Sequence, residues 1–220
     1  MNTEDKLWNC YNGLLISEDI SRIRKLIARY ELFKLSLEIP GDIIECGVFK
    51  GAGLFYWLKL LEIFSNGSSK KIIGFDTFKS FSNDLEGYEK NSADAYVKES
   101  SFSGTSIEDI SSILTKMGLE DKVELVEGEV SNSLEKYCNN NKGFRISLLN
   151  LDFDTYSGTY QALNLLYEKV VNGGIIILDE YAARGWGESD AVDTFFKDKG
   201  EKIRCLDYAN SPTAYIIKGS

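Results

Sequence analysis

Short apolar runs alternate with amphipathic segments along most of the chain. The runs are rich in isoleucine, leucine and valine, which is typical of strands covered on both faces of a parallel sheet. Five parallel strands are expected: Asp42–Val48, Lys71–Thr77, Lys122–Glu129, Ile146–Asp154 and Gly174–Tyr181. The segments with helical spacing between them are Leu54–Phe64, Ser106–Met117, Ser131–Cys138 and Tyr156–Val171. The alternation predicts a doubly wound, Rossmann-like α/β fold with right-handed crossovers.

The end of the chain departs from this alternation. Lys202–Tyr208 and Thr213–Lys218 have the composition of two strands joined by a short turn. We expect them to form an antiparallel hairpin at the edge of the sheet. The complete sheet would then have seven strands, most of them parallel.

The remaining segments predict how the chain is organised. Ser17–Leu37 is expected to be a helix within an N-terminal helical cap over residues 1–38. No internal repeat or interdomain linker is evident, so residues 1–220 are expected to form a single domain. Residues 79–105 form a long polar connection, and such connections are usually functional or disordered. We interpret this segment as a substrate lid, with a surface insertion as the alternative. Its aromatic residues, which suit sugar or nucleotide recognition, are Phe81, Tyr88, Tyr96 and Phe102.

Composition narrows the chemistry. The net charge of −9 and the pI of about 4.7 argue against a nucleic-acid partner, because an acidic surface repels phosphates. A cytoplasmic protein without a membrane partner is expected, since the cysteines are scattered and neither a bilayer-spanning run nor a signal peptide is evident. The absence of histidine excludes a Ser-His-Asp triad and a zinc–histidine site. Proton transfer must therefore use carboxylates, lysines or tyrosines, or depend on a cofactor.

Glycines and acidic residues follow the first three expected strands. Residues 45–53, ECGVFKGAG, have the spacing E-x-G-x-x-x-G-x-G instead of the dinucleotide pattern G-x-G-x-x-G. A leading carboxylate suits the ammonium group of a bound amino acid better than a pyrophosphate; a tight turn without a ligand is the alternative. Asp76 can accept ribose hydroxyls, as acids at this place also do in NAD enzymes. Glu127 and Glu129 could meet an adenine amine or be solvated charges. The candidate cofactor residues are Glu45, Gly47, Val48, Gly51, Asp76, Thr77, Gly128 and Glu129.

Acidic residues also end the fourth and fifth expected strands, which should be neighbours. Asp152 and Asp154 end the fourth, and Asp179 and Glu180 end the fifth. Burying like charges together without a cation is costly. We therefore expect a bound Mg²⁺, or Mn²⁺ or Ca²⁺, with Asp152, Asp179 and Glu180 as ligands. The alternative is that these acids face solvent and cap the following helices, as Asp154 could do for the helix beginning near Tyr156.

Taken together, these motifs resemble the macrocin O-methyltransferase family, whose members methylate deoxysugars in antibiotic biosynthesis, and especially its branch acting on nucleotide-linked sugars. The matching pieces run in order from about Ile39: IPGDIIECGVFKGAG, KIIGFDTFKSF, VELVEGEVSNSLEKY, LLNLDFDTYSGTYQAL, GGIIILDEY and SPTAYII. The resemblance implies a class I methyltransferase fold and a homodimer. It also implies S-adenosylmethionine on Glu45, Gly47, Gly51 and Asp76, and magnesium on Asp152, Asp179 and Glu180. Two residues depart from the family pattern, in which Asp is usual at the positions of Glu180 and Glu129.

The expected reaction is methyl transfer from S-adenosylmethionine to a hydroxyl of a small molecule, with a nucleotide-linked deoxysugar as the expected acceptor. In-line attack needs the acceptor oxygen about 3 Å from the methyl carbon, and a divalent ion would lower the pKa of the hydroxyl. Asp152 or Asp154 is the expected general base, with Lys50 or Lys79 as alternatives. Other acceptors such as catechols, a nicotinamide-dependent sugar-nucleotide enzyme and a non-catalytic methyltransferase-like domain are the alternative functions.

Overall fold

The computed structural model describes residues 3–79, 85, 87–100 and 105–220. Within them lies a six-stranded sheet with the order β3-β2-β1-β4-β5-β6. β1 to β5 are parallel, and β6 is antiparallel to β5. The strands are β1 Asp42–Cys46, β2 Ile72–Asp76, β3 Val123–Glu127, β4 Ile146–Leu151, β5 Val170–Leu178 and β6 Ala214–Ile217. The expected α/β fold with a mostly parallel sheet is confirmed.

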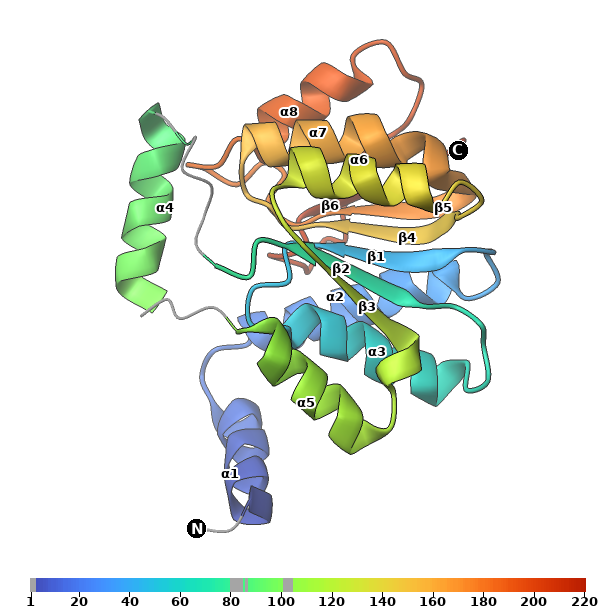
Figure 1. Ribbon diagram of the computed structural model, residues 1–220. Helices are drawn as coiled ribbons and strands as arrows, with labels where there is room; N and C mark the ends of the chain where they lie inside the picture. The colour runs from blue at the N-terminus through green and yellow to red at the C-terminus, as the bar shows by residue number, and fades with distance from the viewer. Residues whose placement is uncertain (1–2, 80–84, 86, 101–104) are drawn as a thin grey trace.

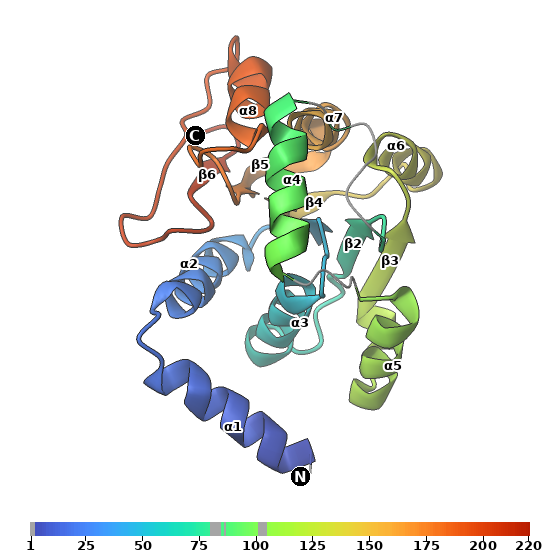
Figure 2. The same cartoon turned by 90° about the vertical axis from the view of Figure 1, so that its left-hand side faces the viewer.

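Helices cover both faces of the sheet (Figure 1). One face carries α2 (Ser21–Ser36), α3 (Ala52–Phe64) and α5 (Ile107–Met117); the other carries α6 (Val130–Asn140), α7 (Tyr156–Leu166) and α8 (Glu188–Phe196). Figure 2 shows α4 (Gly87–Ser100) lying across the edge of the sheet and α1 (Thr3–Ile16) extending away from the body. Single 3₁₀ turns, Glu120–Lys122 and Tyr167–Lys169, precede β3 and β5. Among the described helices, none combines the length and apolar character needed to cross a bilayer.

The expected C-terminal hairpin is reduced to its second strand. The segment 213–218 contains β6, but residues 202–208 make only one antiparallel bridge, between Arg204 and Tyr215. Three of those seven residues are charged, so the burial that would offset the entropy of ordering a longer strand is small. The sheet therefore has six strands in the described residues instead of the expected seven.

Two helix boundaries also differ from the predictions. The helix expected over Tyr156–Val171 ends at Leu166, and β5 begins at Val170. Both parts are apolar, so periodicity alone could not separate them. The helix expected from Ser17 begins at Ser21, where the Asp19 side chain accepts a hydrogen bond of 2.7 Å from the Ser21 N–H.

The sheet separates two hydrophobic cores. Ile44 and Leu149 pack in the core beneath α6, α7 and α8, whereas Ile43 and Leu148 pack in the core beneath α2, α3 and α5. Successive strand residues point to opposite faces of a sheet. Positions 45 and 150, two residues after Ile43 and Leu148, therefore face α2 and α3. This alternation determines which polar side chains lie near the basic residues of α2.

Candidate active site

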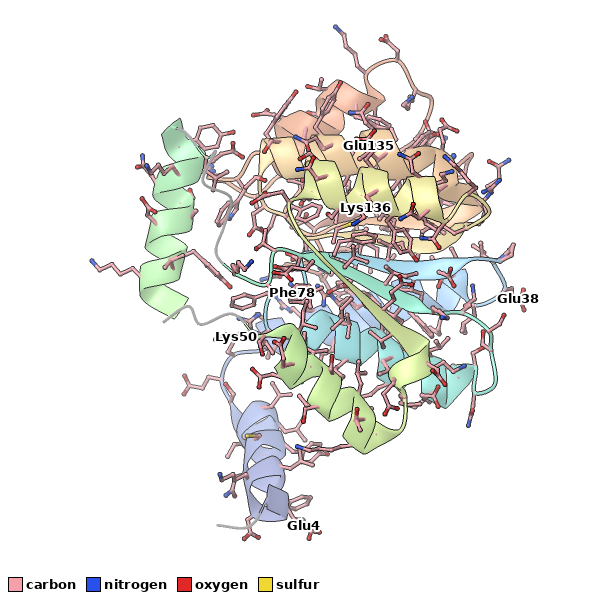
Figure 3. The ribbon with its side chains drawn as sticks, viewed as in Figure 1. Glu4, Glu38, Lys50, Phe78, Glu135 and Lys136 are labelled. Carbon is pink, nitrogen blue, oxygen red and sulfur yellow. The ribbon has the colours of Figure 1, made fainter. Side chains whose placement is uncertain are left out.

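The expected site residues lie at the edge formed by the carboxyl ends of the parallel strands, where open α/β sheets bind ligands. Figure 3 shows Lys50 and Phe78, which follow β1 and β2, on the side of the molecule nearest α4. Glu38, which precedes β1, lies at the opposite edge. Because β1 pairs with β4, the cofactor candidates after β1, β2 and β3 lie beside the acids after β4 and β5.

The loop after β1 depends on glycines with left-handed backbone. Gly47 has a φ of 88° and Gly51 a φ of 81°. A Cβ atom on Gly47 would lie 2.0 Å from the carbonyl oxygen of Asp152, so only glycine fits where this loop passes the end of β4. The Gly51 N–H donates to the Val48 carbonyl at 2.8 Å and closes the turn into α3. The loop therefore makes a tight turn into α3 and passes close to the backbone at the end of β4.

Asp76 is bound to the backbone of this loop. One of its carboxylate oxygens, Oδ2, accepts hydrogen bonds from the N–H groups of Val48 at 2.7 Å and Phe49 at 2.9 Å. The other, Oδ1, accepts from the Phe78 N–H at 2.7 Å. The carbonyl of Asp76 accepts from the Gly128 N–H at 3.0 Å. Asp76 thus connects the ends of β1, β2 and β3.

The other cofactor candidates lie on the same three strand ends. The Thr77 hydroxyl accepts from the Lys79 N–H at 3.3 Å, and Gly128 has a φ of 139°. Glu129 precedes the first turn of α6 without capping it by its side chain. The structure therefore brings together the backbone and side chains of Gly47, Val48, Gly51, Asp76, Thr77, Gly128 and Glu129.

Glu45 differs from these residues because its side chain is enclosed. It is 1% exposed, and its Oε2 atom accepts hydrogen bonds from the Trp57 indole and, at 3.2 Å, from the Asn150 amide. A Cβ on Gly53 would lie 2.0 Å from Glu45 Oε1 and 2.6 Å from Arg29 Nη1, so this approach requires glycine. Burial raises the pKa of Glu45 to about 7, against the opposing effect of the Arg29 charge. In this arrangement the carboxylate supports the loop from inside the protein.

Two cations from α2 lie against the acids that follow β4 and β5. Arg29 Nη2 is 3.1 Å from Asp152 Oδ2 and 3.3 Å from Asp179 Oδ1. Lys25 Nζ is 2.8 Å from Asp179 Oδ2 and 3.9 Å from Asp152 Oδ2. Neither cation was predicted to belong to the site. Their spacing of four residues places both on one face of a helix but does not indicate which surface that face contacts.

These ion pairs affect the acids unequally. Although burial acts to raise it, the charges of Lys25 and Arg29 hold the pKa of Asp179 below its usual range. The pKa of Asp152 is raised to about 6, by burial and then by the Asp179 charge. Burial and the same repulsion raise the pKa of Glu180 to about 7. Burial and repulsion thus favour the protonated forms of Asp152 and Glu180, whereas Lys25 and Arg29 keep Asp179 ionised.

Two further acids belong to this acid cluster, which we define as Asp152, Asp154, Asp179, Glu180 and Glu188. Burial and the neighbouring carboxylates raise the pKa values of Asp154 and Glu188 well above their usual range. Glu188 is fully buried; its Oε1 accepts from the Glu180 N–H at 3.0 Å. In the part of the chain that the structure describes, its Oε2 has no hydrogen-bond partner. Sequence reasoning missed Glu188, which lies at the start of α8 and not at a strand end.

The acid cluster suits a hard divalent cation in chemistry and in charge. Its donors are carboxylate oxygens, its five carboxyl groups outnumber the two cations of α2, and one buried oxygen lacks a partner among the described residues. Its present geometry differs, because both oxygens of Asp179 already accept from Arg29, Lys25 and the Ser211 hydroxyl. Across the described residues, no three acidic or sulfur side chains are arranged as metal ligands. The residues fit such an ion only if the Lys25 ammonium moves.

The described part of the expected lid contains α4, whose aromatic side chains face the site. The Tyr96 ring lies 5.9 Å from that of Phe49 and 6.5 Å from that of Trp186. Burial, followed by the charges of Asp154 and Asp152, raises the pKa of Tyr96. Tyr88 is exposed on α4. Two further aromatic candidates, Phe81 and Phe102, lie outside the described residues.

The alternative roles considered for three residues are not supported by contacts. Asp154 does not cap α7; the cap is the Thr155 hydroxyl, which accepts from the Gly158 N–H at 3.3 Å. Lys50 lies over the ring of the neighbouring Phe49. Lys79 forms an exposed ion pair of 2.9 Å with Glu127. Among the described ion pairs, neither lysine is paired with the acid cluster.

Comparison with known proteins identifies the family of the chain. Residues 21–207 match the family model described as Macrocin-O-methyltransferase (TylF). An enzyme of Streptomyces olivaceus, 8-demethyl-8-(2,3-dimethoxy-alpha-L-rhamnosyl)-tetracenomycin-C 4'-O-methyltransferase, is 24% identical over 148 residues, which are 66% of this chain and 54% of that enzyme. The match thus spans about half the length of that relative.

Solved structures show the same fold. CalS11, described as a calicheamicin methyltransferase and as a TDP-rhamnose 3'-O-methyltransferase, superposes in two crystal structures with TM-scores of 0.81 and 0.76, at 23% and 24% identity. Both matches cover 100% of this chain, and 87% and 88% of the CalS11 chains. The O-methyltransferase NovP has a TM-score of 0.74 at 20% identity, covering 90% of this chain and 81% of NovP. The family match extends over most of the sequence, from α2 to the segment before β6, and so the chain belongs to the macrocin O-methyltransferase family.

Proposed function

We propose that the protein is an S-adenosylmethionine-dependent O-methyltransferase whose acceptor is a sugar hydroxyl, with a nucleotide-linked deoxysugar as the expected substrate. The observation that carries this proposal is the position of the glycine loop after β1 next to the acid cluster after β4 and β5. Membership of the family supports the reaction. Support for the sugar comes from the relatives, because the Streptomyces olivaceus enzyme acts on a rhamnosyl compound and CalS11 is described as acting on TDP-rhamnose.

In this proposal the cofactor binds along the ends of β1, β2 and β3. Gly47 and Gly51 have the left-handed backbone with which the loop turns tightly past the end of β4 and into α3. Asp76 would accept a ribose hydroxyl at Oδ1 while continuing to hold the loop through Oδ2, because a carboxylate oxygen has two lone pairs and both of those on Oδ2 already accept N–H groups. Glu45, which lies beneath the loop beside Arg29, would interact with the methionine part of S-adenosylmethionine.

The acid cluster is proposed to receive the acceptor hydroxyl. Asp152 is the better general base, because with a pKa of about 6 it is largely ionised at pH 7. Asp154, whose pKa is raised further, would hold its proton at that pH. Asp152, Asp179 and Glu180 would hold Mg²⁺, Mn²⁺ or Ca²⁺, which on binding a hydroxyl lowers its pKa.

Tyr96 and Trp186 are proposed to line the acceptor side of the site. Their rings lie over the edge where the strands end, and aromatic faces pack well against sugar rings and bases. The partner is thus a small molecule. The other parts of the proposal are that the chain acts as one methyltransferase domain, that α4 closes over the acceptor, and that two copies form a homodimer.

Incubating the protein with S-adenosylmethionine and a panel of nucleotide-linked deoxysugars tests the function. Mass spectrometry should detect a gain of one methyl group on an acceptor and release of S-adenosylhomocysteine. A control with Asp179→Asn should not methylate, whereas Asp198→Asn, a change at an exposed acid beyond α8, should behave like the parent. Calorimetric binding of NAD without binding of S-adenosylhomocysteine would instead support the nicotinamide-dependent alternative.

A further inference from the structure

Lys25 occupies the space between two residues expected to bind a metal. Its Nζ atom is 2.8 Å from Asp179 Oδ2 and 3.9 Å from Asp152 Oδ2. The Ser211 hydroxyl donates to the same Asp179 oxygen at 2.6 Å, and Arg29 donates to the other oxygen at 3.3 Å. Every oxygen of Asp179 therefore already has a positively charged or hydroxyl donor.

The two cations of α2 differ in how firmly they are held. Arg29 is 5% exposed, bonds to Asp152 and Asp179, and lies 5.5 Å from the centre of the Trp57 ring. Its place is fixed by contacts on several sides. The Lys25 side chain is 22% exposed and has a flexible stem that can carry the ammonium to solvent. Lys25 is therefore the removable charge of the pair.

A divalent ion and the Lys25 ammonium would compete for the same oxygen. Two cations close to Asp179 Oδ2 repel each other, and this repulsion is strong where solvent is excluded. Without an ion, Lys25 and Arg29 offset part of the charge of the acid cluster. Removing that compensation would leave buried carboxylates unpaired, which is destabilising.

We propose that Lys25 is a resident counter-ion of the acid cluster, and that a divalent cation binds only by displacing the Lys25 ammonium from Asp179. This inference rests on the metal-binding part of the proposed function. Because coupling between two binding events is reciprocal, Lys25 weakens cation binding, and the cation releases Lys25 to solvent. Lys25 is thus a positioning residue that keeps the cluster compensated until the ion arrives.

Titration with Mn²⁺, followed by electron paramagnetic resonance of the free ion, tests the first half of this coupling. Lys25→Met should bind Mn²⁺ about tenfold more tightly than the parent, within the usual range of such couplings. Lys25→Arg keeps the charge and should not gain affinity. Lys34→Met removes an exposed lysine from the same helix and should match the parent. Adding Asp179→Asn to Lys25→Met should abolish the gain, because it removes the contested carboxylate.

Amine acetylation of the parent protein tests the second half and does not depend on a variant that folds. Saturating Mn²⁺ should increase the labelling rate of Lys25 several-fold, measured by peptide mass spectrometry, with Lys34 as the internal reference. Equal Mn²⁺ affinity of the parent and Lys25→Met, absence of Mn²⁺ binding in both, or labelling of Lys25 that Mn²⁺ leaves unchanged would each overturn the inference. Its failure is distinguishable from that of the proposed function. Sugar methylation would persist if only the inference fails, whereas the Mn²⁺ and labelling results would persist without methylation if only the function fails.

Discussion

The carboxylate of Asp76 accepts a hydrogen bond of 2.7 Å from the backbone N–H of Val48. This bond joins the end of β2 to the loop after β1, so one side chain shapes the surface along which we propose that the cofactor binds. From its place at the end of the second expected strand, Asp76 was predicted only to accept the ribose hydroxyls of the cofactor. The structure adds a role in holding the loop, independent of any ligand.

Asp76→Ala should weaken the binding of S-adenosylhomocysteine roughly tenfold or more, because hydrogen bonds to a charged group contribute about 1.5–3 kcal/mol. Calorimetry measures the affinity, and circular dichroism checks that the variant remains folded. Asp198→Ala serves as the matched change at an exposed acid. Unchanged affinity in Asp76→Ala would remove Asp76 from the cofactor site.

Gly47→Ala should destabilise the protein strongly. Its φ of 88° is strained for alanine, and the new Cβ would lie 2.0 Å from the carbonyl oxygen of Asp152. Backbone strain alone costs about 1–3 kcal/mol. Gly143→Ala is the matched control, since nothing lies within 4 Å of a Cβ there. Urea unfolding of both variants measures the difference, and equal stability would show that the loop can move away from β4.

Arg29→Met should lower the free energy of unfolding by about 3–5 kcal/mol, because it leaves buried carboxylates without their partner. The deficit should grow as pH rises. Losing the arginine charge raises the folded-state pKa of Glu45 above its present value of about 7, so above about pH 7 the folded variant still binds a proton that the folded parent releases, and its stability falls further with pH. Denaturant titrations at pH 5 and pH 8 measure this trend. Arg145→Met, at an exposed arginine, should show neither effect.

The sequence predicted the sheet well because its strands are continuous apolar runs. Ile43–Ile44 and Ile175–Ile177 fit a buried strand better than an amphipathic helix, and they lie within β1 and β5. The strand predicted over residues 202–208 did not form beyond a single bridge, because the charged residues of this segment leave little apolar surface to bury. The acids and glycines expected at the strand ends do lie side by side, because parallel strands place their carboxyl ends at one edge of the sheet.

The partners of the acids could not be predicted in the same way. Lys25 and Arg29 are separated from Asp179 by roughly 150 positions in the chain, and only packing of α2 on the sheet brings them together. The inward direction of Glu45 could have been derived, because it lies two residues after the core residue Ile43 on the same strand face. The cost of buried like charges was recognised, but protein cations as well as a metal can offset it.

The α4 helix provides a test of lid closure. Binding of S-adenosylhomocysteine with an acceptor sugar should slow amide exchange in residues 87–100, because Tyr96 and Trp186 would then pack against the acceptor. Hydrogen–deuterium exchange with peptide mass spectrometry makes the measurement, with residues 135–140, the second half of α6, as the reference because they lie beyond the cofactor candidates Gly128 and Glu129. Identical exchange of α4 with and without both ligands would count against closure.

Chelation gives the most direct test of the acid cluster. With an identified acceptor, EDTA should abolish methyl transfer and Mg²⁺ should restore it, since the carboxyl groups of the cluster outnumber its two protein cations and offer the oxygen ligands that a hard cation prefers. Asp152→Asn and Asp179→Asn should each lower the rate by about 100-fold or more while S-adenosylmethionine still binds, because the proposed cofactor residues follow other strands. The amide keeps the shape and removes the charge, and Asp198→Asn controls for the loss of an acid elsewhere.

Asp179→Asn also releases Lys25, so thermal unfolding must show that the variant is folded before its rate is interpreted. A rate that survives chelation together with a loss in both Asn variants would mean that Lys25 and Arg29 supply the positive charge and that the carboxylates act without a metal. Full turnover in both folded Asn variants would mean that the acid cluster is structural and takes no part in the reaction.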